Sequence, residues 1–386
     1  MPSEPLHIRA MCAVYSGLPE CGEEMSDPRA WNPWHGCRKY SEGCANCYMY
    51  YLDEARGVPE KSSEIAKTGD FYKPLMKDGS GRYRVPSGFM LRVNMTSDTF
   101  LEEAGEWLGE MWRIIRRRPD VIFYVLTKRA YRIPHCLPED WGGGYENVSL
   151  NITCESQSAF DERWPVLERV PAKHKGLSLS PLLTDIDITP ALESGQIELV
   201  SLGGEGYGGT SPCRYEWMEK ISRDCGEHGV NFVAESVGSV FVKNGSVFES
   251  DSPAVQARWA FNTGLTHISG KPEYRLYSPY DGHLLGEDEL IAPVFNKNRC
   301  FRCSWLRLCS GCIGCGGCKD VVLTDIDGNE VAGRKQSVNR ILRSKNIEDY
   351  FRNQRCAGAG SRTGRSGSRY QASSFPEKRF LAKFAQ

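Results

Sequence analysis

The stretch LEEAGEWLGEMWRIIRRRPDVIFYVLT, Leu101–Thr127, decides the fold class because it joins an amphipathic helix to a buried strand. Apolar residues recur at helical spacing through its first half, at Leu101, Ala104, Leu108, Met111, Trp112 and Ile115. Pro119 ends the expected helix, and the apolar run VIFYVLT that follows is typical of a buried strand. A helix that leads straight into such a strand predicts one unit of a parallel α/β fold.

Outward from this unit, strand-like and helix-like segments continue to alternate. Further strands are expected in ENVSLNIT, ending near Asn151, and in HKGLSLSP (174–181), IELVSLGGE (197–205) and VNFVAES (230–236). The first strand is expected around Ala30 to Asn32, and a helix ended by Gly229 separates the last two. Such alternation implies a parallel sheet with right-handed crossovers. Six or seven units in roughly 210 residues predict a full or partial TIM-like (βα) barrel.

Polar or small residues follow every expected strand, where the barrel would open. They are Asn94, Thr96, Ser97, Asp98, Thr127, Lys128, Arg129, Asn151, Ser180, Gly203, Gly204, Glu205 and Glu235. Structural interpretations exist, since Thr127 and Ser180 could cap loops and Gly203–Gly204 could form a tight turn. Because the carboxyl ends of barrel strands carry the functional site, the shared position of these residues favours a site at this face.

The composition is that of a folded protein without a membrane span. The chain has 386 residues and a net charge of −1, and no apolar run approaches the ~20 residues that a spanning helix needs. The N-terminus lacks a basic region followed by an apolar run, so we expect no signal peptide and a cytoplasmic location. Sixteen cysteines in such a chain indicate metal or redox chemistry rather than disulfides. Seven stand alone and are expected to be small buried residues: Cys12, Cys21, Cys136, Cys154, Cys213, Cys225 and Cys356.

Three cysteines lie close together in WNPWHGCRKYSEGCANCYMY, Trp31–Tyr50, at Cys37, Cys44 and Cys47. A structural zinc ion requires four ligands, and His35 could supply the fourth, although no second ligand pair follows at zinc-finger spacing. A 4Fe–4S cluster held by three thiolates instead leaves one iron open for a small molecule that chelates it through an amine and a carboxylate. Because the three cysteines follow the first expected strand, they would lie at the same face as the strand-end residues.

A series of motifs runs through the chain in the order found in one known family. The motifs are WNPWHGC, GCANCY, VNMTSDTF, FYVLTKRAYRI, NVSLNITCES, LSLSPLLTDIDI and VSLGGEGYG. Over residues 28–240 the chain resembles the phage Gp37/Gp68-like three-Cys-motif proteins (DUF5131-like), which look like a divergent branch of the radical S-adenosylmethionine (SAM) enzymes. Three strand-end motifs depart from the family pattern, since the usual SVEN, SVEPLL and KQWG stand here as NITCES, SLSPLL and AESVG. The last two changes indicate a re-tuned pocket.

This resemblance implies a 4Fe–4S cluster on Cys37, Cys44 and Cys47, with SAM bound to its open iron. The spacing Cys-x6-Cys-x2-Cys is wider in its first gap than the usual Cys-x3-Cys-x2-Cys of radical SAM enzymes. An electron donor such as flavodoxin or ferredoxin would reduce the cluster, and the enzyme would abstract hydrogen from a substrate carbon to allow isomerisation or carbon–carbon bond formation. Lys128, Arg129 and Glu205 would meet the substrate or the SAM carboxylate, with Lys128 and Glu205 as the catalytic residues. Cofactor contacts would come from Ser97, Asp98, Thr127, Asn151, Ser180, Gly203 and Gly204.

A second group of six cysteines lies in CFRCSWLRLCSGCIGCGGC, at Cys300, Cys303, Cys309, Cys312, Cys315 and Cys318. Its first half resembles the SPASM/Twitch-type extension of radical SAM enzymes, which holds auxiliary 4Fe–4S clusters, and its second half has the Cys-x2-Cys-x2-Cys run of bacterial ferredoxins. A zinc knuckle built from four of the six is the alternative. The expected organisation is an N-terminal extension (1–27), a radical SAM barrel (28–240), a small iron–sulfur domain (241–345) and a basic tail (346–386).

The C-terminal part of the chain is strongly basic. From Val331 onward thirteen Lys or Arg stand against three acidic residues, a difference of 13 − 3 = +10 in a chain whose net charge is −1. A Gly/Ser/Arg-rich segment of this charge suits phosphate backbones, although it could instead be a solubilising tail. With the phage resemblance, it predicts a DNA base such as a substituted thymine as substrate, in a phage-infected or host bacterial cell. A peptide-modifying radical SAM enzyme and a non-enzymatic, zinc-stabilised nucleic-acid-binding protein are the alternatives.

Overall fold

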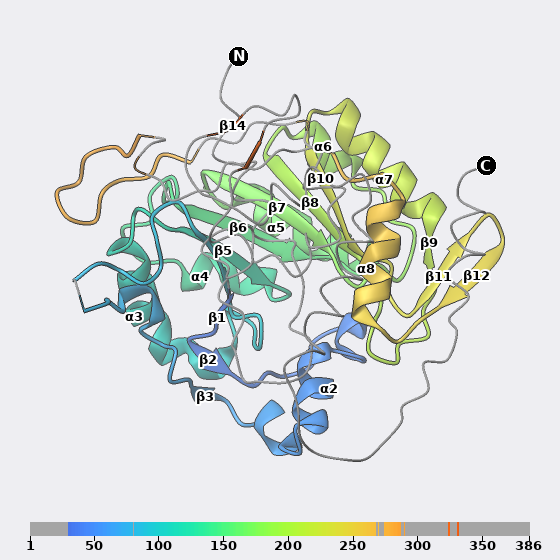
Figure 1. Ribbon diagram of the computed structural model, residues 1–386, viewed down its shortest axis with the longest axis horizontal. Coiled ribbons are helices and arrows are strands. Elements are labelled where there is room, and N and C mark those ends of the chain that lie inside the picture. The colour runs from blue at the N-terminus through green and yellow to red at the C-terminus, as the bar shows by residue number, and fades with distance from the viewer. Residues whose placement is uncertain are drawn as a thin grey trace. The chain divides into compact units, whose positions relative to one another are not determined.

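The computed structural model describes residues 30–79, 81–267, 269, 274–286, 289, 323–324 and 330–331 (Figure 1). The predicted N-terminal extension, the six clustered cysteines from Cys300 to Cys318 and the basic tail lie outside the described residues, so their roles remain predictions. Among the residues that are described, no helix is long and apolar enough to cross a membrane.

Seven parallel strands form the central sheet, and their order in the sheet is their order in the chain. They are β1 (Ala30–Trp31), β4 (Met90–Val93), β5 (Ile122–Thr127), β6 (Val148–Thr153), β7 (His174–Leu179), β8 (Ile197–Gly203) and β10 (Asn231–Ser236). In the parallel register Thr127 lies beside Ile152, and Leu179 lies beside Leu202. The strands make a half-barrel sheet, which confirms the predicted α/β class with a partial barrel (Figure 1).

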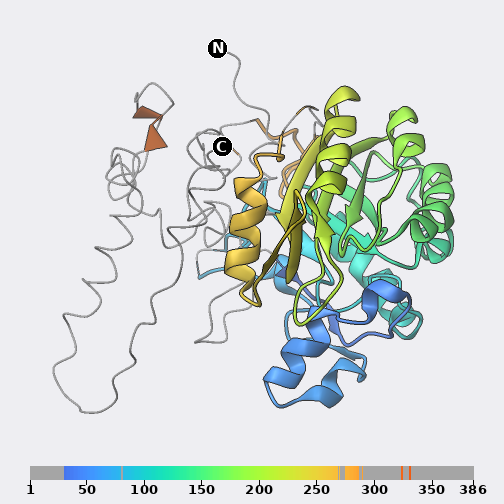
Figure 2. The same ribbon diagram turned by 90° about the vertical axis from the view of Figure 1, so that its right-hand side faces the viewer.

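A helix lies in every crossover between neighbouring strands of this sheet, as parallel pairing requires. The helices are α2 (Tyr48–Ala55), α3 (Gly105–Arg116), α4 (Ile133–Cys136), α5 (Gln157–Arg169), α6 (Thr189–Glu193) and α7 (Tyr215–Glu227), with α8 (Pro253–Asn262) after the last strand. Figure 2 shows the green and yellow-green helices α5 to α7 along one side of the sheet. That side of the sheet is therefore shielded from water by helices.

Short elements complete the fold. The 3-10 turns are Glu42–Cys44, Pro59–Ser62, Lys73–Leu75, Glu102–Ala104 and Ala130–Arg132. Three small sheets pair β2 (Trp34–His35) with β3 (Ala66–Lys67), β11 (Val240–Lys243) with β9 (Cys213–Arg214) and β12 (Ser246–Glu249), and β13 (Leu323–Thr324) with β14 (Glu330–Val331). β2 lies before the segment that carries the three cysteines and α2, and β3 lies after it.

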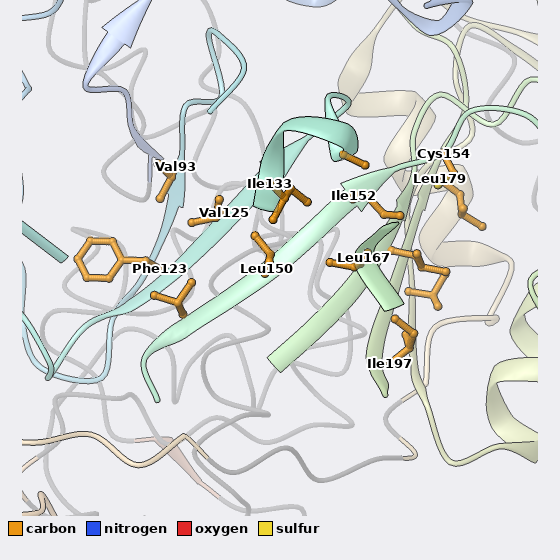
Figure 3. Packing of buried hydrophobic residues seen from close by; sticks show 14 of the residues in the cluster. Val93, Phe123, Val125, Ile133, Leu150, Ile152, Cys154, Leu167, Leu179 and Ile197 are labelled. Carbon is orange, nitrogen blue, oxygen red and sulfur yellow. The ribbon is translucent and has the colours of Figure 1, made fainter. Parts of the chain in front are cut away.

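The main core lies between the sheet and its helices. Strand residues that face the helices are buried and apolar, as Figure 3 shows for Val93, Phe123, Val125, Leu150, Ile152, Leu179 and Ile197. Ile133 from α4 and Leu167 from α5 join the same cluster (Figure 3). Successive side chains of a strand point to opposite faces. The other face of the inner strands carries buried polar residues, including Ser149, Asn151, Ser178 and Ser201.

Two predicted boundaries were wrong. The helix expected from Leu101 begins at Gly105, because a 3-10 turn precedes it. The strand expected to end near Asn151 continues through Ile152 and Thr153, because both residues remain paired with the neighbouring strands. Asn151 therefore lies inside β6 and not at its end.

The isolated cysteines within the described residues are free thiols. Cys154, Cys213 and Cys225 are buried, as predicted, whereas Cys136 is only partly buried. Burial raises the pKa of Cys154 and of Cys213 to about 12. Thiols with such high pKa values are poor nucleophiles at neutral pH, so these residues act as core side chains.

Candidate metal centre

The segment that carries Cys37, Cys44 and Cys47 lies across the carboxyl ends of the sheet. We call residues 36–47, between β2 and α2, the cysteine loop. Four residues that follow strands β4, β5, β6 and β8 hold this loop by hydrogen bonds, and they are Ser97, Arg129, Glu155 and Glu205. The cysteine loop is therefore fixed at the face where the sequence predicted the site.

The first two contacts hold the backbone at the start of the cysteine loop. The Ser97 hydroxyl donates to the Gly36 carbonyl over 2.5 Å, and the Arg129 guanidinium donates to the Arg38 carbonyl over 3.0 Å. Asp98 pairs with Arg129 at 3.3 Å and thereby orients it. Since the first cysteine lies between these two carbonyls in the chain, its position depends on the ends of β4 and β5.

Glu155, buried after β6, holds the middle of the cysteine loop. Its carboxylate accepts a hydrogen bond from the Ser41 hydroxyl and pairs with Arg163 at 2.7 Å and with Lys128 at 3.4 Å. Burial alone would raise the pKa of Glu155, but Lys128 and Arg163 outweigh it and lower this pKa to about 2. A Cβ atom on Gly43 would lie 2.9 Å from the Glu155 side chain, so the loop can approach this closely only with glycine there. The next residue is the second cysteine of the loop.

Glu205, buried after β8, holds the end of the cysteine loop. One carboxylate oxygen accepts a hydrogen bond from the Asn46 side chain over 2.9 Å, and the other accepts one from the Ser211 backbone N–H over 3.1 Å. Asn46 directly precedes Cys47, so Glu205 positions the third cysteine. The predicted contact of Glu205 with substrate stays a prediction, and it would be made by a carboxylate that already supports the loop.

The three thiols of the cysteine loop share one electrostatic neighbourhood. Burial raises the pKa of Cys37 to about 12, and Asp98, Cys44 and Cys47 add to this shift while Arg129 opposes it. Burial also raises the pKa of Cys47. All three are free cysteines. Because metals bind the thiolate form, a bound cation would offset the cost of ionising these buried thiols.

The cysteine loop supplies three thiols as possible metal ligands. Within the described part of the chain, no three His, Cys, Asp or Glu side chains form a group that could hold one metal ion. A zinc ion would draw four ligands to one point at ~2.0–2.3 Å, whereas a 4Fe–4S cluster takes each thiolate on a different iron. His35 Nε2, the possible fourth zinc ligand, lies 2.8 Å from Asp53 Oδ2. Three thiols on one loop equal in number the thiolates of such a cluster with one open iron, and the metal that they hold stays a prediction.

Besides Ser97, three of the predicted cofactor contacts form hydrogen bonds within the protein. Asp98 is buried, and its carboxylate accepts hydrogen bonds from the Thr127 hydroxyl over 2.6 Å and from the Lys128 backbone N–H over 2.9 Å. The Asn151 amide donates to the Val125 carbonyl over 3.1 Å. Asp98 and Thr127 support the strand ends, Asn151 links the interiors of β5 and β6, and the contact of all three with a cofactor stays a prediction.

Gly203 and Gly204 allow close packing after β8. A Cβ atom on Gly203 would lie 2.6 Å from the Ser180 hydroxyl at the end of β7. A Cβ atom on Gly204 would lie 2.2 Å from the Val237 carbonyl. These glycines therefore allow the chain to pack closely on itself, and their predicted contact with a cofactor stays a prediction.

Glu155 and Asn94 have roles at this face that the sequence patterns did not predict. Glu155 lies in the motif NITCES but received no role, because β6 was expected to end four residues before it. The Asn94 side chain, at the end of β4, is buried, and neither its amide group nor the Thr96 hydroxyl has a hydrogen-bond partner within the described residues. Asn94 also has a positive φ of 55°, and such conformations cluster at functional sites. Since unpaired buried polar groups are costly, Asn94 and Thr96 are candidates for ligand contacts.

Comparison with known proteins identifies one family. The chain matches the family described as "Protein of unknown function (DUF5131)" over residues 25–301, which is well over half of its length. No curated protein and no solved structure matches the chain. The matched residues include the half-barrel sheet, the cysteine loop and all four residues that hold this loop.

Proposed function

The chain belongs to the family described as protein of unknown function DUF5131. We propose, from its three-cysteine loop, that it is a radical SAM enzyme with a 4Fe–4S cluster on Cys37, Cys44 and Cys47. One observation carries the proposal: three free thiols lie on a loop that strand-end residues hold across the open face of a parallel half-barrel. Three thiolates leave one iron of such a cluster available to a ligand. An open coordination position is a property of reactive metal centres, not of structural ones.

The chain's own residues would hold the cluster and stabilise the ionised cysteines. Bound there, the cluster and SAM would supply the chemistry of hydrogen abstraction from an unactivated carbon. Arg129 and Lys128 lower the pKa values of Cys37 and Cys47 respectively, against the larger effect of burial, and so favour the thiolates that bind iron. Asn94 and Thr96 would contribute hydrogen bonds to the bound SAM, since these polar groups are unpaired within the described residues.

We further propose that the half-barrel is a TIM-like radical SAM barrel and that Cys300–Cys318 hold at least one auxiliary cluster. The substrate would be a base in phage DNA, such as an already substituted thymine. The basic C-terminal segment supports this class of substrate, because its positive charge suits phosphate contacts. A base within a duplex would have to be flipped out to reach the site. Isomerisation or carbon–carbon bond formation would follow hydrogen abstraction, with flavodoxin or ferredoxin as the reductant.

Anaerobic reconstitution of the full chain, followed by iron, sulfide and zinc analysis, tests the proposal. We expect iron and sulfide together with reductive cleavage of SAM, and loss of this cleavage in Cys37→Ala, Cys44→Ala and Cys47→Ala. Cys136→Ala on α4 is the matched control, because this cysteine lies outside the cysteine loop, and it should retain cleavage. Stoichiometric zinc without SAM cleavage would contradict the proposal and favour the zinc-stabilised nucleic-acid-binding protein.

Mass spectrometry of nucleosides from host-cell DNA tests the substrate class. The DNA would be compared with and without this gene, expressed beside its genomic neighbours. A nucleoside whose mass or retention changes only when the gene is present supports a DNA base as substrate. Unchanged nucleosides, with SAM cleavage stimulated by a peptide, would favour the peptide-modifying alternative.

A further inference from the structure

Three tyrosines form an aromatic cluster beside the third cysteine of the loop. Tyr48 directly follows Cys47 and begins α2, Tyr51 lies about one turn further along this helix, and Tyr207 follows β8. The ring centroid of Tyr207 lies 6.0 Å from that of Tyr48 and 5.2 Å from that of Tyr51. We call Tyr48, Tyr51 and Tyr207 the tyrosine cluster.

The tyrosine cluster combines one exposed ring with one buried hydroxyl that has no hydrogen-bond partner among the described residues. Tyr51 is 50% exposed. The Tyr207 hydroxyl is buried and has no hydrogen-bond partner among the described residues. Tyr207 also has a positive φ of 57°, which bulky residues avoid. A buried, unpaired hydroxyl on a residue with this backbone conformation indicates a group that bonds to a ligand.

A second tyrosine pair, of Tyr40 in the cysteine loop and Tyr131 after β5, differs in this respect. Tyr40 and Tyr131 stack with their ring centroids 6.0 Å apart, and Tyr131 is 47% exposed. The Tyr40 hydroxyl donates to the Glu162 carboxylate over 2.8 Å, and the Tyr131 hydroxyl donates to the Glu102 carboxylate over 2.6 Å. The hydroxyls of this pair are therefore satisfied within the protein, so it serves as an internal comparison for the tyrosine cluster.

The tyrosine cluster lies next to the thiols of the cysteine loop. The Tyr48 hydroxyl donates to the Met95 carbonyl, in the turn that follows β4. Burial raises the pKa of Tyr207 to about 12, and Tyr51 and the Cys47 thiolate contribute to the shift. The tyrosine cluster therefore borders the third cysteine on one side and the end of β4 on the other.

We propose that the tyrosine cluster binds a nucleobase ring, with Tyr51 as the stacking surface and the Tyr207 hydroxyl as the hydrogen-bonding group. Stacking on an aromatic side chain accepts any base, because every base has a π-face. The hydroxyl of tyrosine can donate to or accept from the edge of such a ring. This inference rests on the proposed function and deepens it by naming the residues that hold a base at the site. The base could be the adenine of SAM or a base of a nucleic acid.

Equilibrium binding to the full-length protein tests this inference without turnover. The probes are a single-stranded thymidine oligonucleotide, an abasic oligonucleotide of the same length, and SAM. We expect Tyr51→Ala to weaken binding of the base-containing ligand about tenfold, which is the order of effect for one lost base–aromatic stack. Tyr207→Phe removes only the hydroxyl and should weaken the same binding by about fivefold. The abasic oligonucleotide, which keeps the phosphates, should bind the variants and the wild type alike.

Two further variants control for folding and for general effects of tyrosine removal. Tyr51→Trp keeps an aromatic surface and should retain wild-type affinity. Tyr72→Ala removes an equally exposed ring that lies against Phe71, outside the cysteine loop, and whose hydroxyl is already bonded to Glu110. It should leave all affinities unchanged.

The pattern of losses identifies the source of the base. A loss of affinity for SAM alone would support the proposal with adenine as the ring, and a loss for the thymidine oligonucleotide alone would support it with a nucleic-acid base. The proposal would be overturned if Tyr51→Ala bound both ligands as tightly as the wild type, if neither ligand bound, or if Tyr72→Ala lost as much affinity as Tyr51→Ala. Binding is measured in the absence of reductant. A failure of the tyrosine cluster to bind a base can therefore be distinguished from a failure of the enzyme to cleave SAM.

Discussion

Glu155 is the residue on which the middle of the cysteine loop depends. It is fully buried, pairs with Arg163 and Lys128, and accepts a hydrogen bond from Ser41. The ionised carboxylate of Glu155 is stabilised by the positive charges of Arg163 and Lys128. Those two charges are in turn stabilised by the carboxylate. Removing one partner of a buried ion pair commonly costs about 3–5 kcal/mol, because the other charge is left unpaired. The site therefore relies on an ionised Glu155.

The pH dependence of stability tests this role of Glu155. Its folded pKa of about 2 lies below the ordinary 4.5, so the folded state binds the proton less tightly than the unfolded state. The resulting stability is present above pH 4.5 and is lost as the pH falls toward 2, with a total of about 3 kcal/mol. Denaturant unfolding at pH 7, 4.5 and 3 should show this loss in the wild type and less of it in Glu155→Gln. The exposed Glu139→Gln is the control, and equal pH profiles of all three proteins would contradict the assignment.

At the scale of the element, the cysteine loop takes its shape from its contacts with the strand ends. Its regular secondary structure consists of one 3-10 turn, Glu42–Cys44, after β2 ends at His35. Hydrogen bonds to the ends of β4, β5, β6 and β8 hold it at four points instead. A change in the distance between the loop and one strand end should therefore move the cysteines without unfolding the sheet.

Gly43→Ala tests this anchoring. The added Cβ would lie 2.9 Å from the side chain of Glu155, which is pinned by Arg163, so the loop must shift. We expect a stability loss of about 1–3 kcal/mol and a reduction in iron content and in SAM cleavage of about tenfold or more, because small misplacements at a reactive centre are costly. Gly109→Ala, in α3 with no atom near the added Cβ, is the control and should stabilise the protein by ~0.5–1 kcal/mol. Full iron content in Gly43→Ala would argue against the anchoring.

At the scale of the whole molecule, charge is distributed unevenly along the chain. The net charge is −1, yet residues 346–386 contain eight Lys or Arg and three acidic residues, a difference of 8 − 3 = +5. These residues lie outside the described part of the structure, so the argument rests on composition alone. Positive charge in a separate segment can increase affinity for nucleic acid without forming part of the reactive site.

Binding of single-stranded DNA as a function of salt tests the role of this segment. If its basic side chains contact phosphates, the logarithm of the affinity should fall linearly with the logarithm of the salt concentration, by ~0.7 per phosphate contact. Deleting residues 346–386 should make this slope shallower and leave SAM cleavage without DNA unchanged. An unchanged slope would show that the segment makes no phosphate contacts.

Local patterns in the sequence predicted the α/β class and most of the strands of the half-barrel. Periodicity is a property of neighbouring residues, so VIFYVLT and IELVSLGGE could be recognised as β5 and β8 without tertiary information. Boundaries were less predictable, because Ile152 and Thr153 belong to β6 only through pairing with adjacent strands. The face of the sheet that carries the cysteine loop followed from the rule that barrel sites lie at strand ends.

The sequence by itself determined that three cysteines lie on one loop after the first strand. They are close together in the chain, so their proximity does not depend on the tertiary structure. Only the tertiary structure decided what holds them. Ser41 and Glu155 are 114 residues apart in the chain, and Asn46 and Glu205 are 159 apart. No local spacing rule connects such positions, since parallel strands bring them together only after each crossover has closed. The same reason explains why the sequence did not predict that the Tyr207 hydroxyl is buried without a hydrogen-bond partner among the described residues.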